Sequence, residues 1–269
     1  MKAAIHPTAV VEGGARIGAG VEIGPFCHVG PLAKLGDGVR LISHVSLAGD
    51  TVVGARTVIY PFASIGHPPQ DLKYRGESVR LTIGEDCLIR EGVTMNPGTA
   101  GGGSETIVGP RSVFLANAHV GHDCRIGEGV VFSNNVMLAG HVQVGDFANL
   151  GGGAAVHQFT RIGAHAFIGG LAGVEHDVIP FGIALGNRAA LAGLNIVGLK
   201  RRGFSHETIH ELRRAYKMLF NGGGALKERV ADVAQSFVGH EAVQQIVAFL
   251  QQGGDRAICV PRAGKEEEG

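Results

Sequence analysis

The chain has 269 residues, with 24 Lys and Arg against 24 Asp and Glu, so its formal net charge at pH 7 is zero. This balance argues against a general nucleic-acid binder, which needs a basic face for phosphates. The hydrophobic share of 45% excludes simple disorder. No apolar run approaches the ~18 residues of a membrane span, and the first residues lack the apolar centre of a signal peptide. The cysteines form no Cys-x-x-Cys pair, so we expect a cytoplasmic protein without disulfides or a cysteine zinc site.

An apolar residue recurs at every sixth position through most of the chain. The repeat forms three series of eleven, three and twelve members, and none of these 26 residues is polar. They are Ile5, Val11, Ile17, Ile23, Val29, Leu35, Leu41, Leu47, Val53, Ile59, Ile65; Ile83, Ile89, Met95; and Val108, Phe114, Val120, Ile126, Phe132, Leu138, Val144, Leu150, Val156, Ile162, Ile168, Val174. Glycine often follows them. A sustained period of this kind predicts a β-solenoid, in which each coil buries its apolar residues by stacking on the next.

This pattern resembles the hexapeptide-repeat transferases over about residues 5–179. The resemblance implies a mainly β fold, a left-handed parallel β-helix with three hexads per coil. Residues 1–180 are then the β-helix, and residues 181–204 are a connection. Residues 205–253 show helical spacing of apolar residues, with Ser205 as a plausible N-cap, and predict a small α-helical domain. Residues 254–269 are expected to form a polar tail with little reason to order.

The repeat is interrupted twice, at residues 67–78 and at residues 99–106. With three hexads per coil, both insertions leave the solenoid at the same edge. Loops on a rigid scaffold commonly carry function, so we expect them to form the walls of a cleft there.

Several histidines fall on the same side of the predicted solenoid. An 18-residue coil places His122, His141 and His157 within one residue of a common column on successive coils. His119 ends the preceding hexad, and Asn96 lies one coil below. The shared column and the adjacent loops favour a functional cluster over corner residues that only satisfy neighbouring carbonyls.

Two chemistries suit such a cluster. Three imidazoles can hold zinc, and the gamma-class carbonic anhydrases, which share this kind of solenoid, use a His-x4-His pair; here the pair His119-x2-His122 has a different interval, so no metal is expected. The favoured alternative is general-base catalysis, in which a histidine removes a proton from a sugar hydroxyl. Asp123 follows His122 and can fix its tautomer, and a backbone amide near Gly140 can hold an oxyanion. No cofactor is expected.

Several strings resemble the UDP-N-acetylglucosamine O-acyltransferase family of lipid A biosynthesis, and the match covers nearly the whole chain. They are IGPFCHVGP (23–31), FASIGHPPQDLKYRGE (62–77), NAHVGHDC (117–124), LAGHVQVGD (138–146), VHQFTRIGAHAFIGG (156–170) and NIVGLKRRGFS (195–205). The resemblance implies transfer of an (R)-3-hydroxyacyl chain from acyl carrier protein to the sugar 3-hydroxyl of UDP-N-acetylglucosamine. It also implies a homotrimer.

The resemblance assigns roles to individual residues. His122 is the general base, Asp123 orients it, and Gly140 contributes an oxyanion-binding amide. Substrate-binding roles fall on Asp71, Lys73, Asn96, His119, His141, His157, Gln158, Asn195, Arg201 and Arg202. Gly170 matches the position that sets acyl length, where glycine favours a longer chain. The basic run Lys200–Arg202 suits a diphosphate or an acidic carrier protein.

Two positions depart from the family pattern. Asn96 stands where a histidine is common, and Val197 stands where an acidic residue is common. A 3-amino UDP-sugar, which gives an amide product, is therefore an alternative acceptor. Two further alternatives are another hexapeptide-repeat N-acyltransferase and a solenoid scaffold without catalytic activity.

Overall fold

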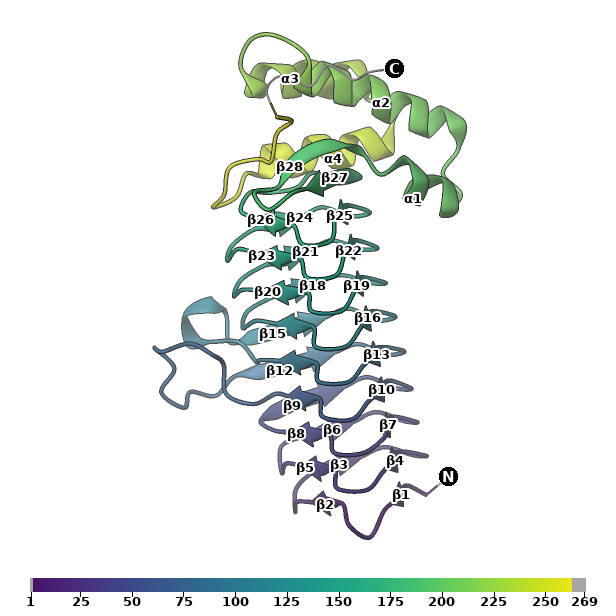
Figure 1. Cartoon of the computed structure of the whole chain (residues 1–269), viewed down its shortest axis with the longest axis vertical. Helices are drawn as coiled ribbons and strands as arrows, with labels where there is room; N and C mark the ends of the chain where they lie inside the picture. Colours follow the sequence, from purple (N-terminus) through teal and green to yellow (C-terminus); the bar gives the residue numbers. More distant parts are fainter. Residues whose placement is uncertain (1, 263–269) are drawn as a thin grey trace.

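Short parallel strands wind into stacked left-handed coils that form a three-sided column, and helices cover its C-terminal end (Figure 1). The structure is a computed structural model that describes residues 2–262. Each coil contributes one strand to each of three sheets of eleven, nine and eight strands, which are parallel except for the last strand of the eleven-stranded sheet. The sheet topology and the helices confirm the predicted fold class.

The strands of the three sheets are as follows. The eleven-stranded sheet contains β1 (Ala4–Ile5), β4 (Glu22–Ile23), β7 (Arg40–Leu41), β10 (Val58–Ile59), β13 (Leu88–Ile89), β16 (Val113–Phe114), β19 (Val131–Phe132), β22 (Asn149–Leu150), β25 (Phe167–Ile168), β27 (Gly182–Leu185) and β28 (Ala190–Leu194). The nine-stranded sheet contains β2 (Val10–Val11), β5 (His28–Val29), β8 (Ser46–Leu47), β11 (Ser64–Ile65), β14 (Thr94–Met95), β17 (His119–Val120), β20 (Met137–Leu138), β23 (Ala155–Val156) and β26 (Gly173–Val174). The eight-stranded sheet contains β3 (Arg16–Ile17), β6 (Lys34–Leu35), β9 (Asp50–Val53), β12 (Arg80–Ile83), β15 (Glu105–Val108), β18 (Arg125–Ile126), β21 (Gln143–Val144) and β24 (Arg161–Ile162).

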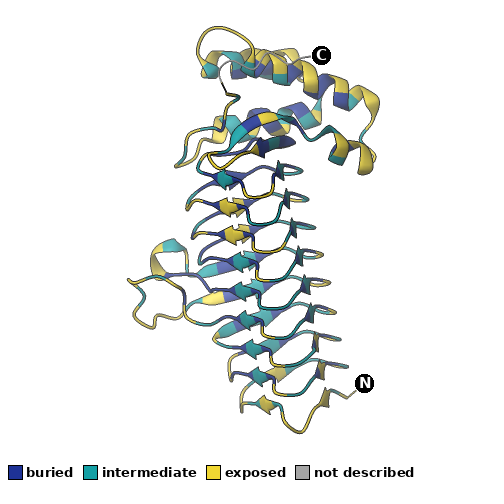
Figure 2. Ribbon diagram, in the orientation of Figure 1, coloured by how far each residue is buried: buried dark blue, intermediate teal, exposed yellow. Residues whose placement is uncertain are grey.

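The core is a column of the repeated apolar residues. Each strand from β1 to β26 ends on one of the 26 residues that the period picked out, and from Ile23 onward these residues are buried (Figure 2). Ile5 in the first coil is 47% exposed, because no coil lies below it. Side-chain size is matched between coils, as where Phe114 and Phe132 meet edge to face at 4.9 Å.

Both insertions leave the column at one edge, as predicted. Residues 67–78 lie between β11 and β12, and residues 99–106, which include the short helix η1 (Ala100–Gly102), lie around the turn from β14 to β15. Both connections run from the nine-stranded to the eight-stranded sheet and project from the same side of the column (Figure 1). We call this corner the loop edge and the two insertions the first loop and the second loop.

The segment 181–204 is more structured than a connection. Strand β27 continues the eleven-stranded sheet, β28 returns antiparallel to it, and α1 (Ile196–Arg201) follows. The hairpin ends the parallel stacking. Ser205 caps α2 (His206–Phe220) by accepting a hydrogen bond from the Thr208 N–H at 3.0 Å, as predicted. Helices α3 (Leu226–Ser236) and α4 (Glu241–Gln252) complete the bundle.

The expected polar tail is wrong for its first part. Ile258 forms a bridge with Asp177, and the Cys259 N–H donates to the Asp177 C=O at 2.8 Å. Cys259 is only 2% exposed. The short apolar run around Ile258 covers the last coil, whose backbone groups would otherwise lack partners. Residues 263–269 of the predicted tail lie outside the described residues. In the part of the chain that the structure describes, no helix has the length and apolar character to span a membrane.

Candidate functional site

The loop edge carries a row of corner residues on successive coils. Asp123, His141 and Phe159 all have left-handed backbone, with φ of 61°, 63° and 64°. Because each coil turns in the same way, the rings of His122 and His141 meet edge to face at 5.1 Å, and His141 stacks on Phe159 at 4.4 Å. The winding therefore brings His122 and His141 together, as the 18-residue spacing predicted.

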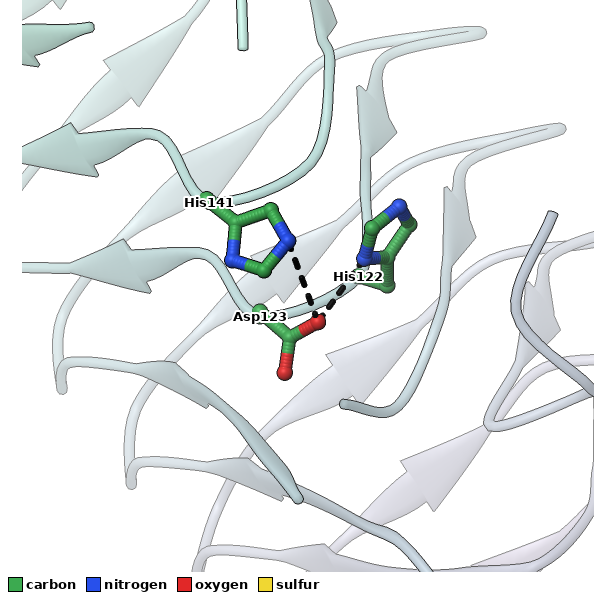
Figure 3. Close-up of side chains that lie close together, drawn as sticks. All are labelled: His122, Asp123 and His141. Carbon is green, nitrogen blue, oxygen red and sulfur yellow. Dashed lines mark hydrogen bonds and ion pairs between the residues drawn. The ribbon is translucent and has the colours of Figure 1, made fainter. Parts of the chain in front are cut away.

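A carboxylate lies beneath these two imidazoles (Figure 3). His122 Nδ1 is 2.8 Å from Asp123 Oδ2, and His141 Nε2 is 3.7 Å from the same oxygen. The Asp123 side chain is fully enclosed, whereas that of His122 is 16% exposed. Since an ionised carboxylate only accepts hydrogen bonds, His122 Nδ1 carries the shared proton, and Nε2 is left with a lone pair. This is the arrangement of a general base with an orienting acid.

Gly140 lies directly against the His122 ring. A Cβ atom at Gly140 would come within 2.5 Å of His122 Nε2, so any side chain would displace the imidazole. The Gly140 N–H donates no hydrogen bond within the described residues, while its C=O accepts from the Phe159 N–H. A free amide donor thus lies on the coil next to the proposed base.

The first loop approaches this cluster from the N-terminal side. The Asp71 carboxylate accepts a hydrogen bond from the Lys73 N–H at 2.9 Å and so orders the loop tip, where the Lys73 side chain is exposed. Burial lowers the pKa of His141, and the nearby carboxylates of Asp123 and Asp71 oppose this lowering. The loop therefore lies within electrostatic reach of the cluster.

Asn96 is buried and acts on the first loop. Its Nδ2 donates to the carbonyl oxygens of His67 and Pro68, each at 3.4 Å. Its Oδ1 is buried and has no hydrogen-bond partner among the described residues. Asn96 thus anchors the base of the loop and retains one unused acceptor.

His119 and His157 lie near the hydrogen-bonded pair of His122 and Asp123, which we call the dyad, and neither is hydrogen-bonded to it among the described residues. His119 Nδ1 is hydrogen-bonded to Thr94 Oγ1 at 2.7 Å, and burial lowers its pKa, with His122 adding to the effect. His157 lies one coil beyond His141, where it and Gln158 are exposed. His157 Nδ1 donates to the Gln158 C=O at 3.2 Å. Both residues belong to the loop edge.

The remaining predicted binding residues lie at another edge of the same chain. Asn195 caps α1 by accepting from the Gly198 N–H at 3.0 Å, and its Nδ2 donates to the His165 C=O. The Arg202 guanidinium covers the Phe147 ring at 4.4 Å. These contacts hold α1 over the corner between the eight-stranded and eleven-stranded sheets, which we call the helix edge. Arg201, in the last turn of α1, is exposed there.

Gly170 lies at the third edge. It follows β25 and precedes Leu171, which is 78% exposed. A Cβ atom at Gly170 would come within 3.3 Å of the Gly152 carbonyl oxygen. One protomer therefore does not bring Asn195, Arg201, Arg202 and Gly170 to the loop-edge cluster.

The ligand atoms that the structure brings together differ from the histidines that the sequence suggested. The structure brings together His122, Asp123 and His141, whose nearest ligand atoms all lie within 4.8 Å of one another. The hydrogen bond between His122 Nδ1 and Asp123 occupies two of these atoms. The short bond favours a proton-transfer dyad over a metal centre.

Thr99 is a residue of the site that the sequence did not reveal. Its N–H donates to Asp123 Oδ1 at 2.9 Å, and its hydroxyl donates to Oδ2 at 2.7 Å. A threonine at the start of an insertion was the only available signal, and it does not reveal a contact with a residue 24 positions away.

Comparisons with known proteins converge on one family. Residues 177–259 match a family model described as UDP N-acetylglucosamine O-acyltransferase, domain 2, and residues 103–140 match the bacterial transferase hexapeptide model. Acyl-[acyl-carrier-protein]--UDP-N-acetylglucosamine O-acyltransferases from Methylobacterium radiotolerans and Rhizobium etli are 68% and 53% identical. The matches cover 96% and 98% of this chain and 95% and 97% of those proteins. The crystal structure of the Moraxella catarrhalis UDP-N-acetylglucosamine O-acyltransferase has a TM-score of 0.92 at 36% identity, covering 95% of this chain and 99% of that one.

Proposed function

The chain belongs to the UDP-N-acetylglucosamine O-acyltransferase family, and on that premise we propose that it catalyses the first step of lipid A biosynthesis. It transfers an (R)-3-hydroxyacyl chain from acyl carrier protein to the 3-hydroxyl of UDP-N-acetylglucosamine. The observation that carries this assignment to particular atoms is the bond between His122 Nδ1 and the buried Asp123, beside Gly140.

The geometry supports a general-base mechanism. His122 Nε2 takes the proton of the sugar hydroxyl as its oxygen attacks the thioester carbonyl. Asp123 stabilises the imidazolium, and the Gly140 N–H donates to the oxyanion of the tetrahedral intermediate. When the C–S bond breaks, His122 returns the proton to the leaving thiolate. The products are the acylated sugar nucleotide and the free thiol of the carrier protein.

The active assembly is a homotrimer in this proposal. The site is incomplete in one chain, because the dyad and the helix-edge residues Asn195, Arg201 and Arg202 lie at different edges. A rotationally symmetric assembly can bring the loop edge of one protomer to the helix edge of the next. Lys73 and the basic end of α1 then bind the diphosphate and the acidic carrier protein.

Surface chemistry supports an interface on the eleven-stranded sheet. From β10 to β25 its outward-facing positions are half-buried and, apart from Asn149, apolar: Val58, Leu88, Val113, Val131 and Phe167. The earlier strands β4 and β7 present the exposed Glu22 and Arg40 at this position. The matching positions of the eight-stranded sheet are more mixed, because Val52 and Ile107 alternate with polar residues: Arg16, Lys34, Thr82, Arg125 and Gln143. Leu72, at the tip of the first loop, is 96% exposed. An apolar outer face and an exposed apolar loop tip both suit contact with another copy.

We place the reaction in the cytoplasm. All four cysteines are free and buried, which fits a reducing compartment. The absence of a side chain at Gly170 leaves space at the third edge and so favours a longer acyl chain; a Cβ atom there would lie 3.3 Å from the Gly152 carbonyl oxygen.

One observation favours a second acceptor, a 3-amino UDP-sugar. Asn96 Oδ1 is an acceptor without a partner among the described residues. A hydroxyl nucleophile has one proton, which His122 removes. An amine has a further N–H to donate, and an unused acceptor near the dyad suits it better.

One assay tests these assignments. Purified protein is incubated with (R)-3-hydroxyacyl carrier proteins of about 10 to 16 carbons and either UDP-N-acetylglucosamine or its 3-amino analogue. We expect ester formation, and a fall of about 10²–10⁴-fold in kcat for His122→Ala. If only the 3-amino sugar nucleotide gives product, it is the acceptor in place of UDP-N-acetylglucosamine. Absence of any acyl transfer would reject the proposed enzymatic activity and favour a scaffold without catalytic activity. Full activity of His122→Ala would reject His122 as the general base.

A further inference from the structure

The Asp123 carboxylate is held mainly by the second loop. Thr99 contacts both of its oxygens, with the N–H on Oδ1 at 2.9 Å and the hydroxyl on Oδ2 at 2.7 Å. The His122 Nδ1–H donates to the same Oδ2 at 2.8 Å. Two donors, one from a loop and one from the imidazole, thus share a single oxygen atom.

The second loop is closed over this contact. The Gly102 and Ser104 N–H groups both donate to the Thr99 C=O, at 3.0 and 2.9 Å. A Cβ atom at Gly102 would overlap the Asp123 carboxylate, so the loop backbone lies directly on it. Thr106, at the other end of the loop, accepts from the Asp123 backbone N–H at 2.8 Å. One end of the loop therefore holds the Asp123 carboxylate, and the other end holds the Asp123 backbone.

We infer that Thr99 is a positioning residue for the acyl transfer, and that its hydroxyl sets the orientation and basicity of His122 through Asp123. The inference rests on the proposed role of His122 as the base. Thr99 is 8% exposed and the Asp123 side chain is fully enclosed. Water therefore cannot readily replace the threonine hydroxyl, and its loss would leave a carboxylate lone pair unsatisfied.

Hydrogen bonds to a carboxylate disperse its negative charge. Without the Thr99 hydroxyl, Oδ2 has one donor fewer and stabilises the His122 imidazolium more strongly. Loss of this donor therefore changes both the orientation of the imidazole and the charge that it faces. The other titratable groups facing this pair are His119, His141 and, through His141, Asp71 and Asp255.

Thr99→Val removes the hydroxyl and keeps the branched shape, whereas Thr99→Ser keeps the hydroxyl. In the full-length protein we expect Thr99→Val to lower kcat about tenfold, to leave KM within about twofold, and to move the acid limb of the kcat/KM profile to higher pH. Thr99→Ser should retain the wild-type limb. Thr106→Val is the matched control, because Thr106 contacts only the Asp123 backbone, and its limb should stay in place. Thr99→Ala removes the same hydroxyl if the valine variant does not fold.

Two outcomes would overturn the inference. One is an unchanged acid limb and kcat in folded Thr99→Val or Thr99→Ala. The other is an equal defect in Thr99→Ser, which would mean that loop packing and not the hydroxyl matters. His122→Ala in the same assay distinguishes a wrong role for Thr99 from a wrong assignment of the general base. Full activity of His122→Ala would mean that His122 is not the base, independently of the result for Thr99.

Discussion

The loop edge and the helix edge use the same corner geometry for different purposes. At the loop edge, His141 stacks on Phe159 beside the buried carboxylate of Asp123. At the helix edge, His165 stacks between Phe147 and Phe181, at 5.2 and 5.4 Å. All of these corner rings have left-handed backbone. The coil therefore supplies a stacking position at each corner, and the inserted segments decide its chemistry.

The electrostatic surroundings show this difference most clearly. Burial lowers the pKa of both His141 and His165. The largest charge effect at His141 comes from the Asp123 carboxylate, which opposes the lowering of the His141 pKa. The largest charge effect at His165 comes from the Arg202 guanidinium, which deepens the lowering of the His165 pKa, while Asp146 opposes it. One edge is thus prepared for proton transfer, and the other holds a neutral ring under a cationic helix.

The largest expected effect comes from inactivating the loop edge and the helix edge in separate chains. His122→Ala and Arg201→Ala should each be nearly inactive alone, because each removes one half of the proposed composite site. When the two variants are co-expressed with different tags and purified as mixed trimers, they should regain about a third of wild-type kcat. This is the fraction of interfaces in which an intact loop edge meets an intact helix edge. No recovery in verified mixed trimers would mean that each protomer uses its own two edges.

A smaller effect is expected from Gly140→Ala. The backbone at Gly140 is not left-handed, so alanine adds no backbone strain, but its Cβ would push against the His122 ring. We expect kcat to fall about a hundredfold while the melting temperature changes little. Gly101→Ala on the second loop, where a Cβ meets nothing within 4 Å, is the control. Equal kcat in both variants would show that the ring does not need its observed position.

The smallest effect concerns stability and the helix edge. His165 binds a proton less readily when folded than when unfolded, because its folded pKa is lowered from about 6.5. The stability it contributes is complete above that pH and is lost as pH falls towards the lowered value. His165→Phe keeps the ring stack and removes the titration, so the urea midpoint should fall less between pH 7.5 and 5.5 than in the wild type. If the urea midpoint falls equally in His165→Phe and in the wild type, His165 does not contribute to the pH dependence of stability.

Most of the solenoid could be predicted because its information is local. Each apolar residue of the period ends a strand, and the insertions leave at the expected edge. The hairpin β27–β28 and the ordered segment around Cys259 were missed, since they cap the column and follow no period. Thr99 was missed for a related reason. Its contact with Asp123 depends on the path of an irregular loop, which no repeat specifies.

The six-residue spacing also could not predict that the site residues are divided between two edges of the column. The hexad period places residues around one coil, so it groups His122 with His141 correctly. It says nothing about Asn195 or Arg202, which follow the repeat and are carried back along the column by α1. Only the contacts of Asn195 with His165 and of Arg202 with Phe147 fix their position.

The partly exposed first coil has a consequence for solubility. The open end of the first coil exposes unpaired peptide groups to solvent, and such edges can pair with strands of other chains and aggregate. Here the open end is broken into strands of two residues, β1, β2 and β3, separated by bends. An incoming segment would have to bend twice to follow it, so end-to-end growth is discouraged by shape without a dedicated cap.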